Sequence, residues 1–236
     1  MSGTIEEKIN KFLNEQGQAP GKLEIDSMSL EDAINFIKER DFDINNFPDF
    51  ESSFKKAQRL ASKGWTKRRN MPVIDTDDVR NLQRALKSGR IDIKPPYHDS
   101  TNPDNPFPEG LSGFEADLFL KRGLKDGEEK DDTVDVNIEK KRIGDLKPIQ
   151  KQIYYDKSMS NIVEFGIDAT IDFLTNKSFF ISSSDNFIID GHHRWLSGML
   201  INPDLKVNVL EIDLPLEKLL PLSRAYSDAI GKSRNQ

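Results

Sequence analysis

The sequence predicts an α+β protein in which a small mixed sheet with helices follows a mainly helical N-terminal region. Three observations lead to this prediction. Residues 29 to 90 repeat apolar side chains with the period of amphipathic helices. About the last hundred residues instead interleave short apolar runs with helical patterns, as strands and helices of one domain do. With 236 residues, the chain is long enough to bury a core.

Composition limits the classes of function before any motif is considered. The chain carries 34 Lys and Arg against 40 Asp and Glu, a formal net charge of −6, so nucleic-acid binding would need a local basic patch. It has no cysteine, which excludes disulfides, thiol nucleophiles and cysteine zinc sites. The N-terminus lacks the apolar core of a signal peptide, and no apolar run is long enough to span a membrane. We therefore expect a cytoplasmic protein with no membrane partner.

The N-terminal region, residues 1 to 110, is expected to be mainly helical after a loosely held arm at residues 1 to 20. Ser29 is a favourable capping residue for a first helix, and Asp49 precedes a second. A third helix is expected to begin at about Thr76, because apolar residues follow it at helical spacing.

Two stretches between the helices and the sheet are predicted to be irregular. Residues 94 to 110 hold five prolines, so they are expected to form a loop or a domain border. Residues 111 to 142 are expected to be a charged linker or excursion, because the part from 121 onward has almost no apolar residue before Val134.

Residues 143 to 236 are expected to form the domain that contains the sheet, followed by a C-terminal helix. An extended segment is predicted first, then helices on either side of Gly166. The apolar runs SFFIS and NFIID, separated by a Ser/Asp turn, have the pattern of a β-hairpin. A helix after residue 191, a strand at 205 to 213, and two helical segments at 216 to 220 and 222 to 230 complete the prediction.

The sequence FIIDGHHRW, residues 187 to 195, places two of the three histidines and an arginine directly after a predicted strand. Gly191 permits a sharp turn there, and a helix is expected to begin at His192 or His193. The free N–H groups of a helix N-terminus attract anions, and His and Arg side chains add donors at the same place. The motif therefore predicts a phosphate-binding turn.

Two other interpretations of this motif stay open. In the first, it is an ordinary hairpin end, where Asp190 caps the helix and the histidines are half buried. In the second, the histidines bind zinc. Adjacent histidines at a turn rarely point at one metal ion, however, and the third histidine, His98, lies far away in the sequence.

GHHR after an apolar strand, preceded by DLKPIQKQIYYDKSMSNIVEFG, resembles the ParB/sulfiredoxin superfamily, which includes phage ParB-like proteins and free serine kinases with a DGHHR motif. The resemblance covers about residues 140 to 213. It implies a ParB/sulfiredoxin-like sheet and a site for ATP or another nucleoside triphosphate. It also implies a location in the host cytoplasm if the chain is phage-encoded. His192 occupies the position of the catalytic cysteine of sulfiredoxins, which rules out sulfiredoxin activity.

The resemblance also assigns roles to individual residues. Nucleotide phosphates would be held by Lys157 and Ser160, on the helix after a segment that starts with Pro148 and Gln150. Gly191, His193 and Arg194 of the turn would complete this site. The spacing agrees, because two residues three apart share one face of a helix. The plain alternatives are a solvated lysine at 157 and a capping serine at 160.

The acidic candidates lie close to the same motifs. Asp190 is the carboxylate adjacent to the turn, where it could orient a histidine, take a proton or hold Mg²⁺, or simply form the turn. The candidate catalytic residues are therefore Asp190, His192 and His193. Glu164, one helical turn after Ser160, is a second candidate for a metal ion or for proton transfer, with plain exposure as the alternative.

A basic patch lies apart from these motifs in the sequence. Lys63, Lys67, Arg68 and Arg69 surround Trp65, a combination that could bind a DNA backbone or be an ordinary solvated face. Because the patch lies outside the phosphate motifs, nucleotide binding is expected not to depend on it.

Three classes of function fit these observations. The first is an enzyme that hydrolyses ATP or another nucleoside triphosphate, or transfers its phosphoryl group. The second is a ParB-like DNA-associated protein, either a nuclease or a nucleotide-gated DNA binder. The third is a non-catalytic module that keeps the fold. A homo-oligomer is compatible with each class, and the first is favoured.

Overall fold

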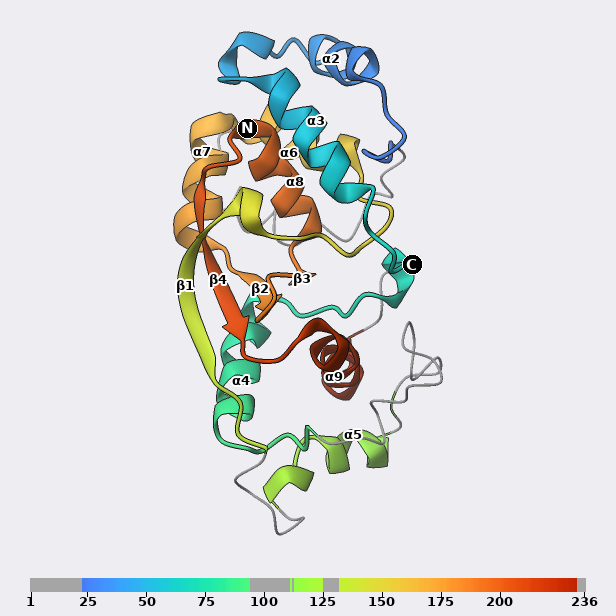
Figure 1. The fold of residues 1–236 in the computed structure, drawn as a ribbon, viewed down its shortest axis with the longest axis vertical. Coiled ribbons are helices and arrows are strands. Elements are labelled where there is room, and N and C mark those ends of the chain that lie inside the picture. The colour runs from blue at the N-terminus through green and yellow to red at the C-terminus, as the bar shows by residue number, and fades with distance from the viewer. Residues whose placement is uncertain (1–22, 94–110, 112, 125–131, 233–236) are drawn as a thin grey trace, which may run out of the picture.

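The computed structural model describes residues 23–93, 111, 113–124 and 132–232. In this part of the chain, a four-stranded mixed sheet carries helices on both of its faces (Figure 1). The predicted α+β fold class is confirmed. The predicted arm and the proline-rich stretch at 94–110 lie outside the described residues. Among the described helices, none is both long enough and apolar enough to cross a membrane.

The first two helices begin at the capping residues that the sequence predicts. Helix α2 spans Leu30–Lys38 and helix α3 spans Phe50–Ala61. The side chains of Ser29 and Asp49 each accept a hydrogen bond from the backbone N–H three residues further on. These bonds satisfy N–H groups that have no partner within the helix, which is why the two helices start at these positions.

The other helices agree with the sequence pattern, except that the helix at Gly113–Phe119 lies in the predicted charged linker and the last helix is not divided in two. Their bounds are α4 Thr76–Lys87, α5 Gly113–Phe119, α6 Tyr155–Phe165, α7 Ile167–Asp172, α8 His192–Ile201 and α9 Leu216–Ala229. Shorter turns are η1 Ile44–Asn46, η2 Arg68–Asn70, η3 Arg122–Leu124, η4 Ile143–Asp145 and the π-helical η5 Phe173–Lys177. Helix α9 is continuous through Pro221, where two segments were predicted. Buried leucines on both sides of Pro221 hold the two halves against one core, so tertiary packing prevails over the local preference of proline.

The sheet follows the order β1-β4-β2-β3. Its strands are β1 Val136–Arg142, β2 Phe180–Ser183, β3 Ile188–Asp190 and β4 Lys206–Ile212. Strand β4 runs antiparallel to β1 and parallel to β2, and β2 forms the predicted antiparallel hairpin with β3. Strand β1 corrects the prediction of a charged linker or excursion at 111–142, because residues 136–142 pair along the full length of β4.

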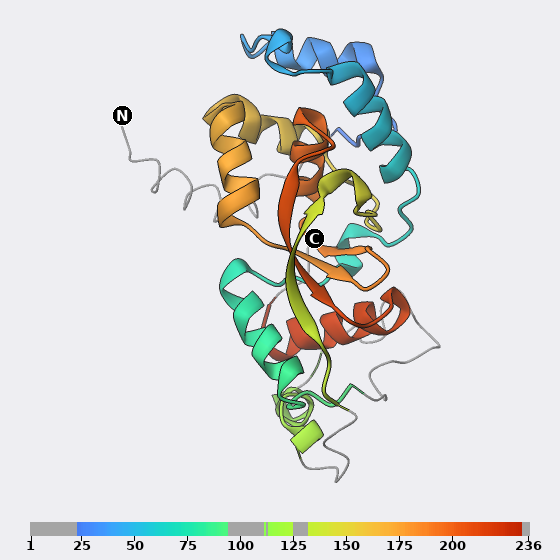
Figure 2. The same cartoon turned by 60° about the vertical axis from the view of Figure 1, so that its left-hand side comes forward.

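Alternation along the strands divides the apolar side chains between two cores. Phe180, Val207 and Val209 belong to the first core, with α2, α3, α6 and α8. Ile181 and Leu210 belong to the second core, with α4, α5 and α9. Both views show the first group of helices at one end of the molecule and the second group at the other (Figures 1 and 2). The N-terminal helices therefore share both cores with the residues after 142.

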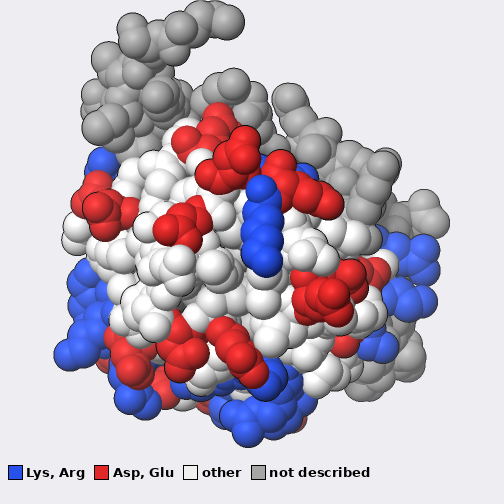
Figure 3. Space-filling model, turned by 90° about the horizontal axis from the view of Figure 1, so that it is seen from above, with Lys and Arg blue, Asp and Glu red and all other residues white. Residues whose placement is uncertain are grey.

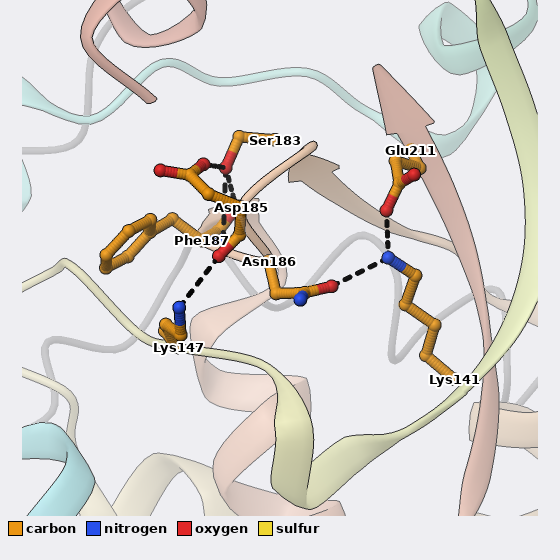
Figure 4. Close-up of polar contacts among 7 residues, drawn as sticks. All are labelled: Lys141, Lys147, Ser183, Asp185, Asn186, Phe187 and Glu211. Carbon is orange, nitrogen blue, oxygen red and sulfur yellow. Dashed lines mark hydrogen bonds and ion pairs between the residues drawn. The ribbon is translucent and has the colours of Figure 1, made fainter. Parts of the chain in front are cut away.

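The turn of the β2–β3 hairpin is fixed by polar side chains (Figure 4). The hydroxyl of Ser183 donates to the carboxylate of Asp185 at 2.5 Å, and Asp185 also accepts a bond from the N–H of Leu216 at the start of α9. The ammonium group of Lys147 donates to the carbonyl of Asp185 at 3.0 Å and lies 4.9 Å from the centroid of the Phe187 ring. These contacts hold the hairpin, and therefore the end of β3, in one place.

The segment of the basic patch pairs with a distant part of the chain. The N–H groups of Trp65 and Thr66 donate to the carbonyl of Ile149 at 2.9 and 3.0 Å, and the N–H of Lys151 donates to Thr66 at 2.8 Å. A Cβ atom on Gly64 would lie 2.6 Å from the carbonyl oxygen of Gln150. Glycine at 64 is therefore what allows the two backbones to approach this closely.

Charge is unevenly distributed over the surface. Viewed from above, acidic side chains occupy most of the charged surface in the middle of this face, and basic ones lie mainly near its rim (Figure 3). Segment 26–51, which includes α2 and the start of α3, exposes the carboxylates of Asp26, Glu31, Asp32, Glu39, Asp41, Asp43, Asp49 and Glu51. Its exposed basic side chains are Lys38 and Arg40. We call this segment the acidic face.

Replacing Gly64 should show how much the fold depends on this close approach. We expect Gly64→Ala to lower the free energy of unfolding by about 1 to 3 kcal/mol, because the new methyl group would press on backbone atoms of residue 150. Gly113→Ala is the matched control, because a Cβ atom there meets nothing within 4 Å. Equal stability of the two variants in chemical denaturation would contradict this account.

Candidate functional site

The turn after β3 has the predicted geometry. Strand β3 ends at Asp190, Gly191 has a φ of 107°, and α8 begins at His192. A Cβ atom on Gly191 would lie 2.8 Å from the ring of Phe180, so both the backbone conformation and the available space require glycine here. The first N–H groups of α8 have no partner within the helix, and the helix dipole makes this end positive.

His192 is buried and hydrogen-bonded to backbone groups, so its ring is not exposed to a ligand. Its side chain is 4% exposed, and its Nε2 atom accepts hydrogen bonds from the N–H groups of Ile149 and Gln150, both at 3.3 Å. Burial, with a smaller effect from Arg194, lowers the pKa of His192 to about 3. The ring is therefore neutral near pH 7, and its acceptor nitrogen is occupied by two backbone donors.

His193 faces the start of α6. Its Nε2 atom accepts a hydrogen bond from the N–H of Tyr154 at 3.2 Å, and the two rings stack with centroids 5.8 Å apart. The side chain is 9% exposed, so both histidines are buried rather than half buried. Burial holds the pKa of His193 well below its usual value, and the positive charges of Lys157 and Arg68 lower it further.

Arg194 and Asp190 form a partly buried ion pair. The Nη2 atom of Arg194 lies 2.5 Å from a carboxylate oxygen of Asp190, and it also donates to the carbonyl of Phe179 at 3.2 Å. The Nε atom of Arg194 is buried without a hydrogen-bond partner among the described residues. Burial raises the pKa of Asp190, and Arg194 opposes that rise. The Asp190 side chain does not cap α8, which corrects the hairpin-end interpretation on this point.

The predicted phosphate residues of α6 point to different surroundings. Lys157 is half buried; its burial, followed by the charge of Arg68, lowers its pKa to about 8, while Asp156 acts in the opposite direction. Ser160 is exposed, and its hydroxyl donates to the carbonyl of Asp156 within the same helix at 2.7 Å. The contacts of α6 therefore direct Lys157, but not the hydroxyl of Ser160, toward His193.

The remaining candidate site residues lie either beside the two histidines or away from them. Gln150 is buried beside His192, and its side-chain Nε2 atom donates to the carbonyl of Gln152 at 3.2 Å. Glu164 is exposed on α6. Within the residues that the structure describes, no three His, Asp or Glu side chains come together as metal ligands, and His98 is not among these residues.

Arg68 belongs to this site, although its sequence position did not indicate it. Its guanidinium carbon lies 5.3 Å from the centroid of the Tyr154 ring, and its charge lowers the pKa values of both Lys157 and His193. Its Nε atom is buried and has no hydrogen-bond partner among the described residues. The basic patch, which lies apart from the phosphate motifs in the sequence, therefore comes close to them in the structure at Arg68.

A cavity of about 420 Å³ lies between residues 23–28 and α2, and Leu23 and Glu24 of its lining pair with residues 154–156 at the start of α6. Its lining includes the carboxylates of Glu24, Asp32 and Glu39. Burial raises the pKa of Glu24, and the nearby charge of Asp26 adds to the effect. This acidic lining is unsuited to an anionic ligand, so the cavity is not part of the candidate site.

The two bonds accepted by His192 should make stability depend on pH. The pKa of His192 is below the unfolded value, so its neutral form stabilises the fold above about pH 6.5, and this contribution is lost as the pH falls toward 3. We expect His192→Gln, which keeps an acceptor but cannot titrate, to reduce the pH slope of the unfolding free energy by about 1.4 kcal/mol per pH unit in this range.

A second variant separates the role of the acceptor from that of titration. His192→Leu should destabilise the fold at every pH by about 2 to 6 kcal/mol, because two buried N–H groups lose their partner. Denaturant unfolding at several pH values measures both effects. An unchanged pH slope in His192→Gln would show that His192 is not the buried neutral acceptor described above.

The chain was compared with family models, curated proteins and solved structures. No family model, curated protein or solved structure matches it.

Proposed function

We propose that the N-terminus of α8 binds the phosphate groups of a nucleotide, with Lys157 and Arg194 as the main charged ligands. One observation carries the proposal. Lys157 of α6 and Arg194 of α8 both lie close enough to His193 for their charges to lower its pKa. Two cations from separate elements thus flank a helix N-terminus whose first N–H groups have no partner within the helix.

The surroundings of these cations favour the binding of an anionic ligand in addition to the nearby protein carboxylates. Asp190 offsets part of the charge of Arg194, and Asp156 part of that of Lys157. Burial makes the remaining positive charge costly unless a further negative group arrives. A phosphate chain meets this need, because arginine binds phosphate oxygens in pairs and lysine binds them as a point charge.

The resemblance of the GHHR turn and the Lys-x-x-Ser helix to ParB/sulfiredoxin proteins supports ATP or another nucleoside triphosphate as the source of these phosphates. In this proposal Gly191 forms the turn that leads into α8, and Gln150 supports His192 beneath the turn by donating its backbone N–H to the ring. Mg²⁺ would enter with the nucleotide and neutralise charge on its phosphates. Ser160 contributes less than the motif implies, since its hydroxyl is bonded within α6.

The favoured activity is hydrolysis of the nucleotide or transfer of its phosphoryl group. Asp190 is the best placed proton acceptor or metal ligand, because it stands next to the turn and its pKa is raised by burial. A phosphate that draws Arg194 away would leave this carboxylate more basic. The histidines would act by positioning the turn, since the Nε2 atom of each already accepts backbone bonds.

A second candidate function is DNA binding by the basic patch. The side chains of Lys63, Lys67 and Arg69 are exposed, and Trp65 is 44% exposed, which leaves an aromatic surface between cations. Such a surface can hold a nucleic-acid backbone and stack on a base. This function would be separate from the phosphate site, except at Arg68.

Removal of Arg194 tests the nucleotide proposal directly. We expect Arg194→Ala to weaken ATP binding about ten- to a hundredfold in calorimetry with Mg²⁺, because charge-assisted bonds of roughly 1.5 to 3 kcal/mol are lost. The control is the double reversal Lys67→Glu and Arg69→Glu, which should leave ATP affinity within a few-fold. Unchanged ATP affinity in a folded Arg194→Ala variant would end the proposal.

The double reversal Lys67→Glu and Arg69→Glu should abolish any DNA binding. Unchanged DNA binding in this variant would end the second candidate function.

Lys157 should make nucleotide affinity depend on pH in a recognisable way. The charged groups that act on its pKa are Arg68, which lowers it, and Asp156, which raises it. Its pKa of about 8 means that affinity should fall as the pH rises through 8, where phosphates are already fully ionised. Lys157→Arg should keep the binding and remove this decrease. A wild-type affinity that is constant between about pH 7 and 9 would exclude Lys157 as a ligand.

A further inference from the structure

We propose that Arg68, from the N-terminal region, is a third phosphate-binding residue and makes the site prefer a chain of two or three phosphates over a single phosphate. This inference rests on the nucleotide site proposed above. It assigns a role to a residue that no phosphate motif of this sequence contains, and it names the class of ligand as a di- or triphosphate group.

Backbone contacts fix the position of Arg68 independently of any ligand. The segment before it pairs with residues 149–151, as described for Trp65 and Thr66. The N–H of Arg68 itself donates to the side-chain oxygen of Gln152 at 3.3 Å. Gln152 has a φ of 61°, a left-handed conformation that bends the chain between Lys151 and Tyr154. The bend places the ring of Tyr154 next to the Arg68 guanidinium group.

The guanidinium group of Arg68 has unused binding capacity. No ion pair joins it to a carboxylate of the described residues, and its buried Nε atom has no hydrogen-bond partner among them. Its neighbours differ, because Lys67 and Arg69 are exposed to solvent while Arg68 is half buried. A half-buried cation with an unsatisfied donor is costly, so a negative ligand in contact with it would be stabilised.

The position of Arg68 relative to Arg194 indicates the length of the ligand. Arg194 is held by Asp190 and by the carbonyl of Phe179 on the sheet side of the turn. Arg68 is held at Gln152 and Tyr154, on the segment that leads into α6. The charges of both arginines lower the pKa of His193, whose ring stacks on the same Tyr154 ring that Arg68 contacts. Because the arginines are held on different segments, a phosphate chain can contact each cation along its length, whereas a single phosphate would have to draw all of them to one centre.

The test compares phosphate chains of different length on matched arginine variants. Binding of inorganic phosphate, pyrophosphate and tripolyphosphate is measured by calorimetry on the wild type, on Arg68→Ala and on Arg69→Ala. Arg69 is the matched control, because it lies in the same turn and carries the same charge but is exposed. Arg68→Met serves as a second variant that keeps the packing on Tyr154 if the alanine variant unfolds.

We expect the Arg68 variants to weaken tripolyphosphate and pyrophosphate binding about tenfold or more, and inorganic phosphate by less than about threefold. Arg69→Ala should bind all three as the wild type does. Equal losses in the Arg68 and Arg69 variants, or losses that do not depend on chain length, would overturn the inference. In either case a large loss in Arg194→Ala would leave the proposed function intact. Absence of binding of every phosphate and nucleotide to the wild type would instead overturn the proposed function itself.

Discussion

The structure around the candidate site depends on one ring nitrogen of His192. Its Nε2 atom accepts two backbone N–H groups from residues 149 and 150, which would otherwise be buried without a partner. The same short segment is bonded on another side to residues 65 and 66. The start of α8, the segment before α6 and the basic patch are therefore joined through one neutral side chain. A protonated ring cannot accept these bonds. The geometry of the site therefore requires a neutral His192, which its low pKa ensures.

The electrostatics of the site follow from this arrangement. The fixed turn brings Arg194 next to Asp190 and brings Lys157 and Arg68 into range of His193. Nearby carboxylates offset only part of this charge, and burial keeps the two histidines neutral. The positive charge is thus carried by arginine and lysine side chains, which suit phosphate oxygens better than an imidazole that must keep its structural bonds.

Local signals made much of the fold predictable. Ser29, Asp49, Gly166 and Gly191 act on their own neighbours, so the sequence alone indicated where helices begin or end. Strand β1 escaped prediction because most of its side chains are exposed and its partner β4 lies about 70 residues further along the chain. Burial of both halves of α9 in one core made that helix continuous, although proline usually interrupts a helix.

The candidate site shows the same division between local and distant effects. The turn at 190–194 was predictable because its residues are consecutive. The position of Arg68 next to this turn was not, since it depends on pairing with a segment more than 80 residues away. The direction of the Ser160 hydroxyl could not be predicted from the motif either, because a serine in a helix can donate to the carbonyl one turn earlier. The short cluster of Gly64 and Trp65 beside basic residues was the only sequence feature near Arg68 that hinted at a site.

The acidic face gives the molecule an electrical polarity that the net charge of −6 conceals. Carboxylates from α2 and the start of α3 spread a negative potential over one end, while the proposed phosphate site lies among half-buried cations. A polyanion that diffuses toward the protein is repelled from one end and rotated before contact, so productive encounters come from a limited range of directions. This guidance reaches about 10 Å at an ionic strength of 0.1 M and shortens in more salt. For the proposed phosphate ligand, the rate of capture would thereby depend partly on residues that never touch it.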